Sequence, residues 1–247
     1  MNEQLSPKLR TVEKYQPLYP LNTFTQDFAM RLGRSLIAFL AARGSDRLEG
    51  SDWEEMFAKC VGARWTPSNV GLDDITLAQM AWGAKTVKNR TPFTAQTVRL
   101  ISGRNSLAYS FGEMDIPKDP NEVGKKILSI WNERVKSVRA KFAHLRTVVL
   151  LKGVGLREVS VFEMDTCLYD PNDYDWQWNE KNNLEGLEKA SCFHKFTWQP
   201  SGSQFTIIEK IPQKRLSIRI KPPEAIDEDV ILEAVRFNDS WITIVSI

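Results

Sequence analysis

The residues best suited to chemistry in this chain are Asp74 and Lys85, both within the segment 71–88. The segment holds two short runs of strand-forming residues, which predict a hairpin. Asp74 would open the first strand and Lys85 would lie inside the second, so the two side chains would meet at the shared end. An anion there can hold Mg²⁺, and a cation can orient water and offset charge during phosphodiester hydrolysis. The pair is also compatible with a surface hairpin that has an exposed acidic turn and a solvated lysine.

A third candidate, this one acidic like Asp74, lies on the helix expected before the hairpin, over residues 51–61. The apolar side of this helix holds Trp53 and Phe57. With 100° between successive residues, Glu54 lies at the border of that side, whereas Glu55 points away. Because a carboxylate at such a border is costly unless it is paired or binds a metal, Glu54 is a candidate partner of the hairpin residues.

The segments 53–57, 71–75 and 82–85 together resemble the PD-(D/E)xK catalytic core of type II restriction endonucleases, over roughly residues 23–155. The resemblance implies a Mg²⁺-dependent nuclease with a restriction-endonuclease-like fold. The site residues that it implies are catalytic Asp74, Lys85 and Glu54, and metal-binding Asp74, Glu54 and Asp73.

The chain departs from the family pattern at one position. The acidic residue expected two places before Lys85 is Gly83, and taking Lys88 as the lysine puts Thr86 at that place. Three alternatives stay open for the missing ligand. The carboxylate can come from another element, a backbone carbonyl can act together with a side-chain amide, or the nuclease fold is catalytically inactive. In the first alternative Glu54, Asp73 or Glu113 would supply the carboxylate, and in the second the amide would be that of Gln79.

Charge is distributed unevenly along the chain. Residues 85–152 carry fourteen Lys and Arg against five Asp and Glu, while residues 160–190 carry two against eight. A basic middle favours contact with a polyanion. Arginine and the amides can read base edges, and alternating basic residues on a strand can contact phosphates. The expected DNA-contacting residues are Lys88, Arg104, Asn105, Gln199, Ser201, Gln204, Arg215 and Arg219.

The periodicity predicts an α/β fold in which helices flank a mixed central sheet. An arm over 1–22 precedes a single domain over 23–247, with a catalytic core over about 23–155 and a mostly β recognition and dimerisation part over about 156–247. Residues 170–189 are expected to form a loop with one helical turn. Two tryptophans in this loop, Trp176 and Trp178, suit a subunit interface. Helices are expected at 25–42, 51–61 and 119–142, and further strands at 97–101, 107–111, 147–151, 158–162, 193–198, 204–208, 216–220 and 241–245.

Composition narrows the class of protein. A hydrophobic fraction of 42% and a charged fraction of 26% are ordinary for a globular chain. Three scattered cysteines and two histidines argue against a disulfide framework, structural zinc or a histidine-based site. Without an apolar run of roughly 20 residues or a signal peptide, a cytoplasmic protein that does not enter a membrane is expected.

The sequence therefore predicts a Mg²⁺-dependent type II restriction endonuclease that hydrolyses double-stranded DNA at a short specific sequence. The resemblance implies a homodimer on a palindromic site, because symmetric DNA needs symmetric protein. It also implies a cognate DNA methyltransferase as a functional rather than a physical partner. The alternatives are a non-catalytic DNA-binding or regulatory protein on a degenerate nuclease fold, and a protein–protein interaction domain that uses the tryptophan-rich acidic segment.

Overall fold

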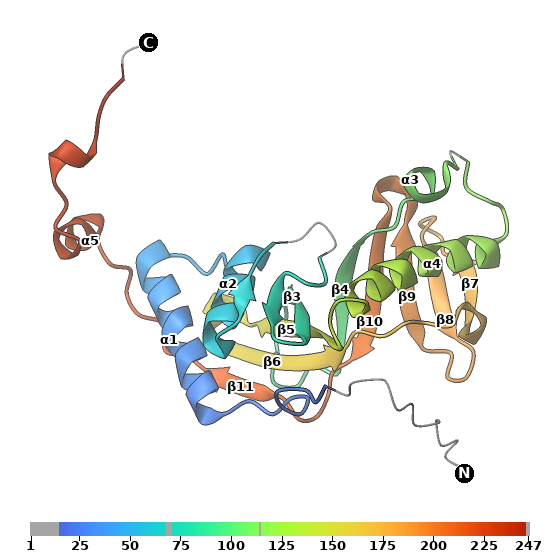
Figure 1. The fold of residues 1–247 in the computed structure, drawn as a ribbon, viewed down its shortest axis with the longest axis horizontal. Coiled ribbons are helices and arrows are strands. Elements are labelled where there is room, and N and C mark those ends of the chain that lie inside the picture. Colours follow the sequence, from blue (N-terminus) through green and yellow to red (C-terminus); the bar gives the residue numbers. More distant parts are fainter. Residues whose placement is uncertain (1–14, 68–70, 114, 246–247) are drawn as a thin grey trace.

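The computed structural model describes residues 15–67, 71–113 and 115–245. Two sheets make up its framework, and helices cover them (Figure 1). In the described residues, no helix is both long and apolar enough to cross a membrane. The α/β class with mixed sheet and flanking helices is thus confirmed.

The first sheet has six strands in the order β1-β2-β3-β5-β6-β11. Only the β3–β5 pair is parallel, which makes the sheet mixed. Its strands are β1 (Arg64–Trp65), β2 (Ile75–Leu77), β3 (Met80–Lys88), β5 (His144–Lys152), β6 (Glu158–Asp165) and β11 (Leu216–Arg219).

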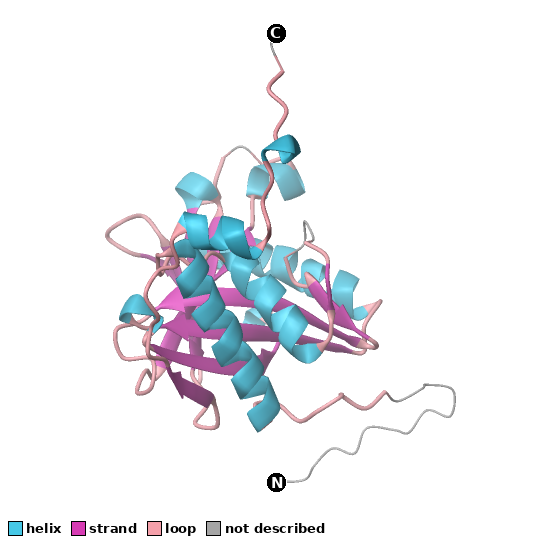
Figure 2. Cartoon of the chain, turned by 90° about the vertical axis from the view of Figure 1, so that its left-hand side faces the viewer, coloured by secondary structure: helices cyan, strands magenta, loops and turns pink. Residues whose placement is uncertain are grey.

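One face of this sheet is covered by α1 (Gln26–Arg43) and α2 (Gly50–Val61) (Figure 2). Thr25 caps α1 by accepting a hydrogen bond from the Phe28 amide, and Gly44 ends it in the left-handed conformation. The core beneath the two helices is rich in aromatic side chains, including Trp53, Phe57 and Trp82.

The second sheet is antiparallel and has the order β4-β10-β9-β8-β7. Its buried residues share a core with α4 (Pro120–Arg139), which also contacts Leu72, Ala81 and Leu145 near the first sheet. The helix thus lies against both sheets and is part of the connection between the parallel strands β3 and β5. The strands are β4 (Thr97–Arg104), β7 (Tyr174–Trp178), β8 (Leu184–Glu188), β9 (His194–Gln199) and β10 (Gln204–Lys210).

Three sequence-based expectations about elements are wrong. Residues expected as a strand at 107–111 form α3 (Leu107–Phe111), because Ser106 caps its start and Gly112 ends it. The expected loop at 170–189 holds η2 (Pro171–Asp173) and the hairpin of β7 and β8. Described residues of 241–245 contain no strand. Short helical segments not mentioned above are η1 (Val154–Leu156), η3 (Pro200–Gly202), α5 (Glu228–Ala234) and η4 (Asp239–Trp241).

Trp176 shows why the acidic segment folds. Its ring is 4% exposed and stacks on Phe196, with 5.5 Å between ring centroids. A Cβ atom added to Gly124 of α4 would lie 2.2 Å from that ring, so this glycine lets the helix approach the strand closely. Trp176 is therefore a core residue within the chain, which corrects its assignment to a subunit interface.

The two sheets do not follow the expected division of the chain near residue 155. β4 precedes that point but belongs to the second sheet, whereas β6 and β11 follow it and extend the first. Part of the expected arm is packed rather than free, since the Tyr19 hydroxyl donates to a Glu163 oxygen at 2.7 Å. Residues 1–14 of the arm lie outside the described residues. Beyond Pro222 the chain leads away from the sheets through α5 (Figures 1 and 2).

Candidate active site

The hairpin predicted from the sequence is formed by β2 and β3, with Ile75 paired to Trp82. Asp74 directly precedes β2, is 5% exposed, and accepts a backbone hydrogen bond from the Thr66 amide at 2.7 Å. Ile75 and Trp82 face the α1–α2 core. By strand alternation, Asp74 and Lys85 belong to the opposite face of the hairpin.

Asp74, Glu54 and Lys85 interact electrostatically with one another. Burial lowers the pKa of Lys85, and the negative charges of Asp74 and Glu54 oppose that change. Burial also raises the pKa of Glu54, and the charge of Asp74 raises it further, whereas the Trp65 indole hydrogen bond and Lys85 lower it. The three residues predicted from sequence, on α2, before β2 and on β3, are therefore brought together.

Glu54 is held in place by the strand that follows its helix. The Trp65 indole nitrogen donates to the Oε2 atom of Glu54 at 3.1 Å. Glu54 is half-buried, whereas its neighbour Glu55 is exposed, as the helical periodicity predicts.

A fourth charged group, not anticipated from the sequence, joins these three. Arg134 of α4 lowers the pKa of Lys85, while Asp74 opposes the lowering effect of burial on the pKa of Arg134. The signal that could have identified Arg134 is the one used for Glu54. Arg134 lies beside buried Val135 and three residues after buried Trp131, hence at the border of the apolar face of α4.

The carboxylates of Asp74 and Glu54 are the side chains that could hold a cation. Mg²⁺ is commonly bound by one or two carboxylates, with waters and substrate phosphates completing its octahedron. A cation would also relieve the repulsion between the two carboxylates that contributes to the raised pKa of Glu54. The donor set therefore fits Mg²⁺. In the described part of the chain, no group of three or more Asp, Glu, His or Cys side chains is arranged so that it could hold a metal ion.

The other candidates for the missing ligand are less well placed. Half-exposed Asp73 is not among the described charges that shift the pKa of Glu54 or Lys85. Glu113 accepts a hydrogen bond from Lys126 at 2.6 Å. Gln79 lies in the hairpin turn, at the other end of β2 from Asp74.

Two turns expected to read DNA come together at one end of the second sheet. Gln204 pairs with Arg104 on one side and with Gln199 on the other. Ser201 is exposed in η3, within the same connection between β9 and β10. These four residues can therefore present guanidinium, amide and hydroxyl groups on one surface.

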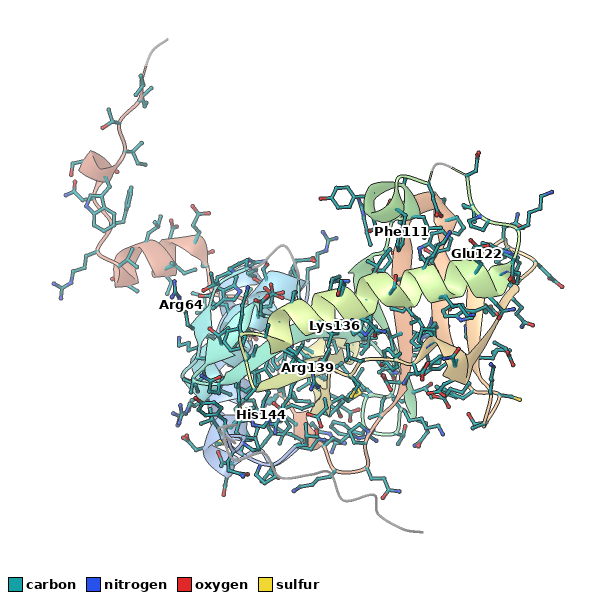
Figure 3. All side chains as sticks on the ribbon, turned by 45° about the vertical axis from the view of Figure 1, so that its right-hand side comes forward. Arg64, Phe111, Glu122, Lys136, Arg139 and His144 are labelled. Atoms are coloured by element: carbon teal, nitrogen blue, oxygen red, sulfur yellow. The ribbon has the colours of Figure 1, made fainter. Side chains whose placement is uncertain are left out.

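Arg104 and Arg134 line the same groove, a hollow of about 840 Å³ between α3 and α4. Exposed Tyr109 and Phe111 border it on α3, and Lys136 borders it on α4. Figure 3 shows Phe111 beside the long α4, with Lys136 and Arg139 toward the end of that helix. The groove therefore connects the expected reading residue Arg104 with the charged cluster.

Asn105 does not belong to this surface. It is fully buried, and its Nδ2 atom donates to the Ile127 carbonyl at 2.9 Å. Its own carbonyl accepts a hydrogen bond from the Trp198 indole at 2.9 Å. The expectation that Asn105 contacts bases is corrected, because this amide joins the second sheet to α4.

The basic residues at and before β11 that were expected to contact phosphates make contacts within the chain instead. The Arg215 guanidinium donates to the backbone carbonyls of Phe93 and Ala95. Arg219 pairs with Glu158 at 2.9 Å and lies over the Phe93 ring. The expected phosphate-contacting role is therefore corrected for Arg215, whose donors hold the chain near residue 95 against β11. Arg219 stays largely exposed but is paired.

Lys88 lies away from the reading end of the second sheet. It is exposed at the end of β3, opposite Lys152 in the parallel pair. Both lysines line a separate hollow of about 430 Å³, which also contains Asp46. Lys152 donates to the Leu48 carbonyl at the start of the α2 region.

No family model, curated protein or solved structure matches this chain.

Proposed function

We propose that the protein is a Mg²⁺-dependent endonuclease that hydrolyses double-stranded DNA at a short specific sequence, as type II restriction endonucleases do. The observation that carries the proposal is the convergence of Asp74, Glu54 and Lys85 from three elements onto one partly buried site. Two carboxylates and a lysine supply what metal-assisted phosphodiester hydrolysis requires.

The roles of the side chains follow from their charges and positions. Mg²⁺ bound by Asp74 and Glu54 would polarise the scissile phosphate and lower the pKa of the attacking water. Burial lowers the pKa of Lys85, and the charges of Asp74 and Glu54 oppose that shift. The ammonium group could donate hydrogen bonds to that water and offset charge in the transition state. The Trp65 indole orients the Glu54 carboxylate.

Sequence recognition is proposed for the end of the second sheet. Arg104, Gln204 and Gln199 are adjacent on β4, β10 and β9, with Ser201 in the connection that joins β9 and β10. Arginine can contact guanine through two hydrogen bonds, and glutamine can contact adenine in the same way. A homodimer would present two such surfaces to a palindromic site, and a cognate methyltransferase would protect host DNA.

The first test is incubation of the purified protein with phage DNA and Mg²⁺, followed by gel electrophoresis. Discrete fragments are expected from the wild type and none from Asp74→Ala or Lys85→Ala, because each change removes one member of a concerted constellation. Lys85→Ala should retain DNA binding. Asp229→Ala, on exposed α5, is a control that should cut normally. Cleavage near the wild-type level by Asp74→Ala or Lys85→Ala would refute the assignment.

A non-catalytic DNA-binding protein is the second candidate. It is favoured by Gly83, because a Cβ atom at this position would lie 3.1 Å from the Gly71 carbonyl oxygen and 3.2 Å from the Leu72 Cα atom. A side chain at the position expected for the second acidic ligand would therefore require the backbone of residues 71–72 to shift. Salt-sensitive DNA binding without Mg²⁺-dependent cleavage would establish this candidate, whereas an absence of binding at low salt would favour a protein–protein interaction domain.

A further inference from the structure

Arg134 lies beside the ends of two separate segments. Its Nη1 atom donates to the Ser102 carbonyl at 2.6 Å, near the end of β4. Its Nη2 atom lies 3.9 Å from the position that a Cβ atom on Gly71 would occupy, at the start of the segment leading to Asp74. One guanidinium from α4 is thus hydrogen-bonded to the end of β4 and lies next to the segment that leads into the catalytic hairpin, an arrangement that forms a bridge between the two.

Glycine makes room for this bridge. Gly103 has a φ angle of +104°, and a Cβ atom there would lie 2.7 Å from Nη1 and 3.1 Å from the Cζ atom of Arg134. A side chain at residue 103 would therefore displace the guanidinium and strain the backbone. The end of β4 is shaped around Arg134.

The bridge also has an electrostatic side. Arg134 is half-buried, and the charge of Asp74 counteracts the effect of this burial on the arginine pKa. Burying a guanidinium is costly unless it is hydrogen-bonded and paired. The Ser102 carbonyl and the Asp74 charge together compensate that cost, so displacement of one should disturb the other.

The residue after Gly103 is Arg104, which pairs with Gln204 at the proposed reading surface. If Arg104 shifts when it binds a DNA base, the Ser102 carbonyl, two residues earlier in the same strand, should therefore shift with it. The planar fork of arginine can hold two partners in one fixed geometry, whereas lysine offers a single flexible ammonium.

We infer that Arg134 is a positioning residue that couples sequence recognition by Arg104 and Gln204 to hydrolysis at the Asp74–Lys85 site. The inference rests on the proposed nuclease function. In this account the second sheet controls the rate of hydrolysis in addition to binding DNA.

The test compares Arg134→Lys and Arg134→Gln with the wild type on cognate duplexes and on duplexes with one altered base pair. Binding is measured in Ca²⁺ and single-turnover cleavage in Mg²⁺. Both variants should cleave cognate DNA about 100-fold more slowly, the order of loss expected for misplaced reacting groups. Their affinity for cognate DNA should change little.

The second measurement is the discrimination between cognate and altered duplexes, which a merely structural role of Arg134 would not alter. In the wild type, an altered base pair should reduce cleavage more than it reduces binding. In both Arg134 variants the two reductions should become equal, since recognition no longer controls the site. Arg139→Gln is the matched control, because Arg139 is also on α4 and donates to a backbone carbonyl, that of Thr166, at 2.8 Å. It should retain the wild-type excess of cleavage discrimination.

The outcomes separate the two proposals. If the wild type does not cleave, the nuclease function fails and the inference fails with it. If the wild type cleaves and Arg134→Lys keeps its rate and its excess discrimination, the inference alone is overturned. Thermal unfolding is followed in parallel, and unfolding of both Arg134 variants at the assay temperature would assign a structural role and also overturn the inference.

Discussion

Gly83 shows how backbone packing shapes the candidate site at the level of single residues. The backbone of residues 71–72 lies against it, so a side chain at residue 83 would require that backbone to shift by a few tenths of an ångström. An acidic residue introduced at 83 would displace the segment that positions Asp74. The proposed metal site then needs a second carboxylate from another element, and among the described residues Glu54 interacts with both Asp74 and Lys85.

Glu54→Gln should reduce Mg²⁺-dependent cleavage far more than Glu55→Gln. The physical reason is that Glu54 is half-buried and close to Asp74, whereas Glu55 is exposed on the other side of α2. The expected loss is at least about 100-fold, since a second metal ligand orients both metal and water. Cleavage rates across a Mg²⁺ titration measure it. Equal rates for the two variants would remove Glu54 from the site.

At the scale of elements, β4 links the two halves of the molecule. It follows β3 in the chain but pairs with β10 in the other sheet, and its last residues lie against Arg134 of α4. Adjacent residues at its end therefore have different roles. Arg104 is exposed in the groove, and Asn105 is buried between the second sheet and α4.

Arg104→Gln and Asn105→Ala should separate recognition from stability. Loss of the Asn105 amide removes its buried hydrogen bond to the Ile127 carbonyl, at a cost of about 1–3 kcal/mol in the free energy of unfolding. Arg104→Gln should leave that free energy unchanged and lose about 1–3 kcal/mol of discrimination against altered sites. Chemical denaturation and binding to cognate and altered duplexes measure the two effects. A stable Asn105→Ala variant with lost discrimination would return Asn105 to the DNA surface.

At the scale of the whole molecule, a buried ion pair joins the N-terminal arm to the first sheet. Arg146 of β5 pairs with Glu163 of β6 at 3.1 Å, and both side chains are almost fully buried. Glu163 also accepts hydrogen bonds from Trp82 at 2.8 Å and from Tyr19 at 2.7 Å. One carboxylate therefore connects β3, β5, β6 and the arm.

This network predicts a pH dependence of stability. Burial raises the pKa of Glu163, although Tyr19, Arg146 and Trp82 oppose the shift. The folded state then holds the Glu163 proton to higher pH than the unfolded chain does, since unfolded glutamates ionise at about pH 4.3. The contribution of Glu163 to stability is therefore full below that pH and falls as the pH rises through the folded pKa.

Comparison with Glu163→Gln isolates this contribution, because glutamine does not titrate. The free energy of unfolding of the wild type minus that of the variant should decrease between about pH 4 and pH 7. Urea unfolding at several pH values measures it. A difference that grows with pH would mean that the three hydrogen-bonding partners of the Glu163 carboxylate outweigh burial and that its pKa is lowered.

Local patterns in the sequence determined α1, α2, α4, the β2–β3 hairpin and the face of α2 on which Glu54 lies. These features depend on periodicity, capping residues and turn residues within a few positions of one another. The electrostatic interaction of Asp74 with Lys85 was predictable for the same reason, because the two strands are joined by a short turn.

Only the tertiary structure decided which sheet each strand joins and which groups meet across elements. Strand periodicity does not specify a partner, so nothing local distinguishes β4, which pairs with β10, from a neighbour of β3. The exposed or buried state of Asn105 and the contacts of Arg215 depend on chain segments far away in sequence. Arg134 meets Asp74 for the same reason, since the packing of α4 between the two sheets brings residues sixty positions apart into one charged cluster.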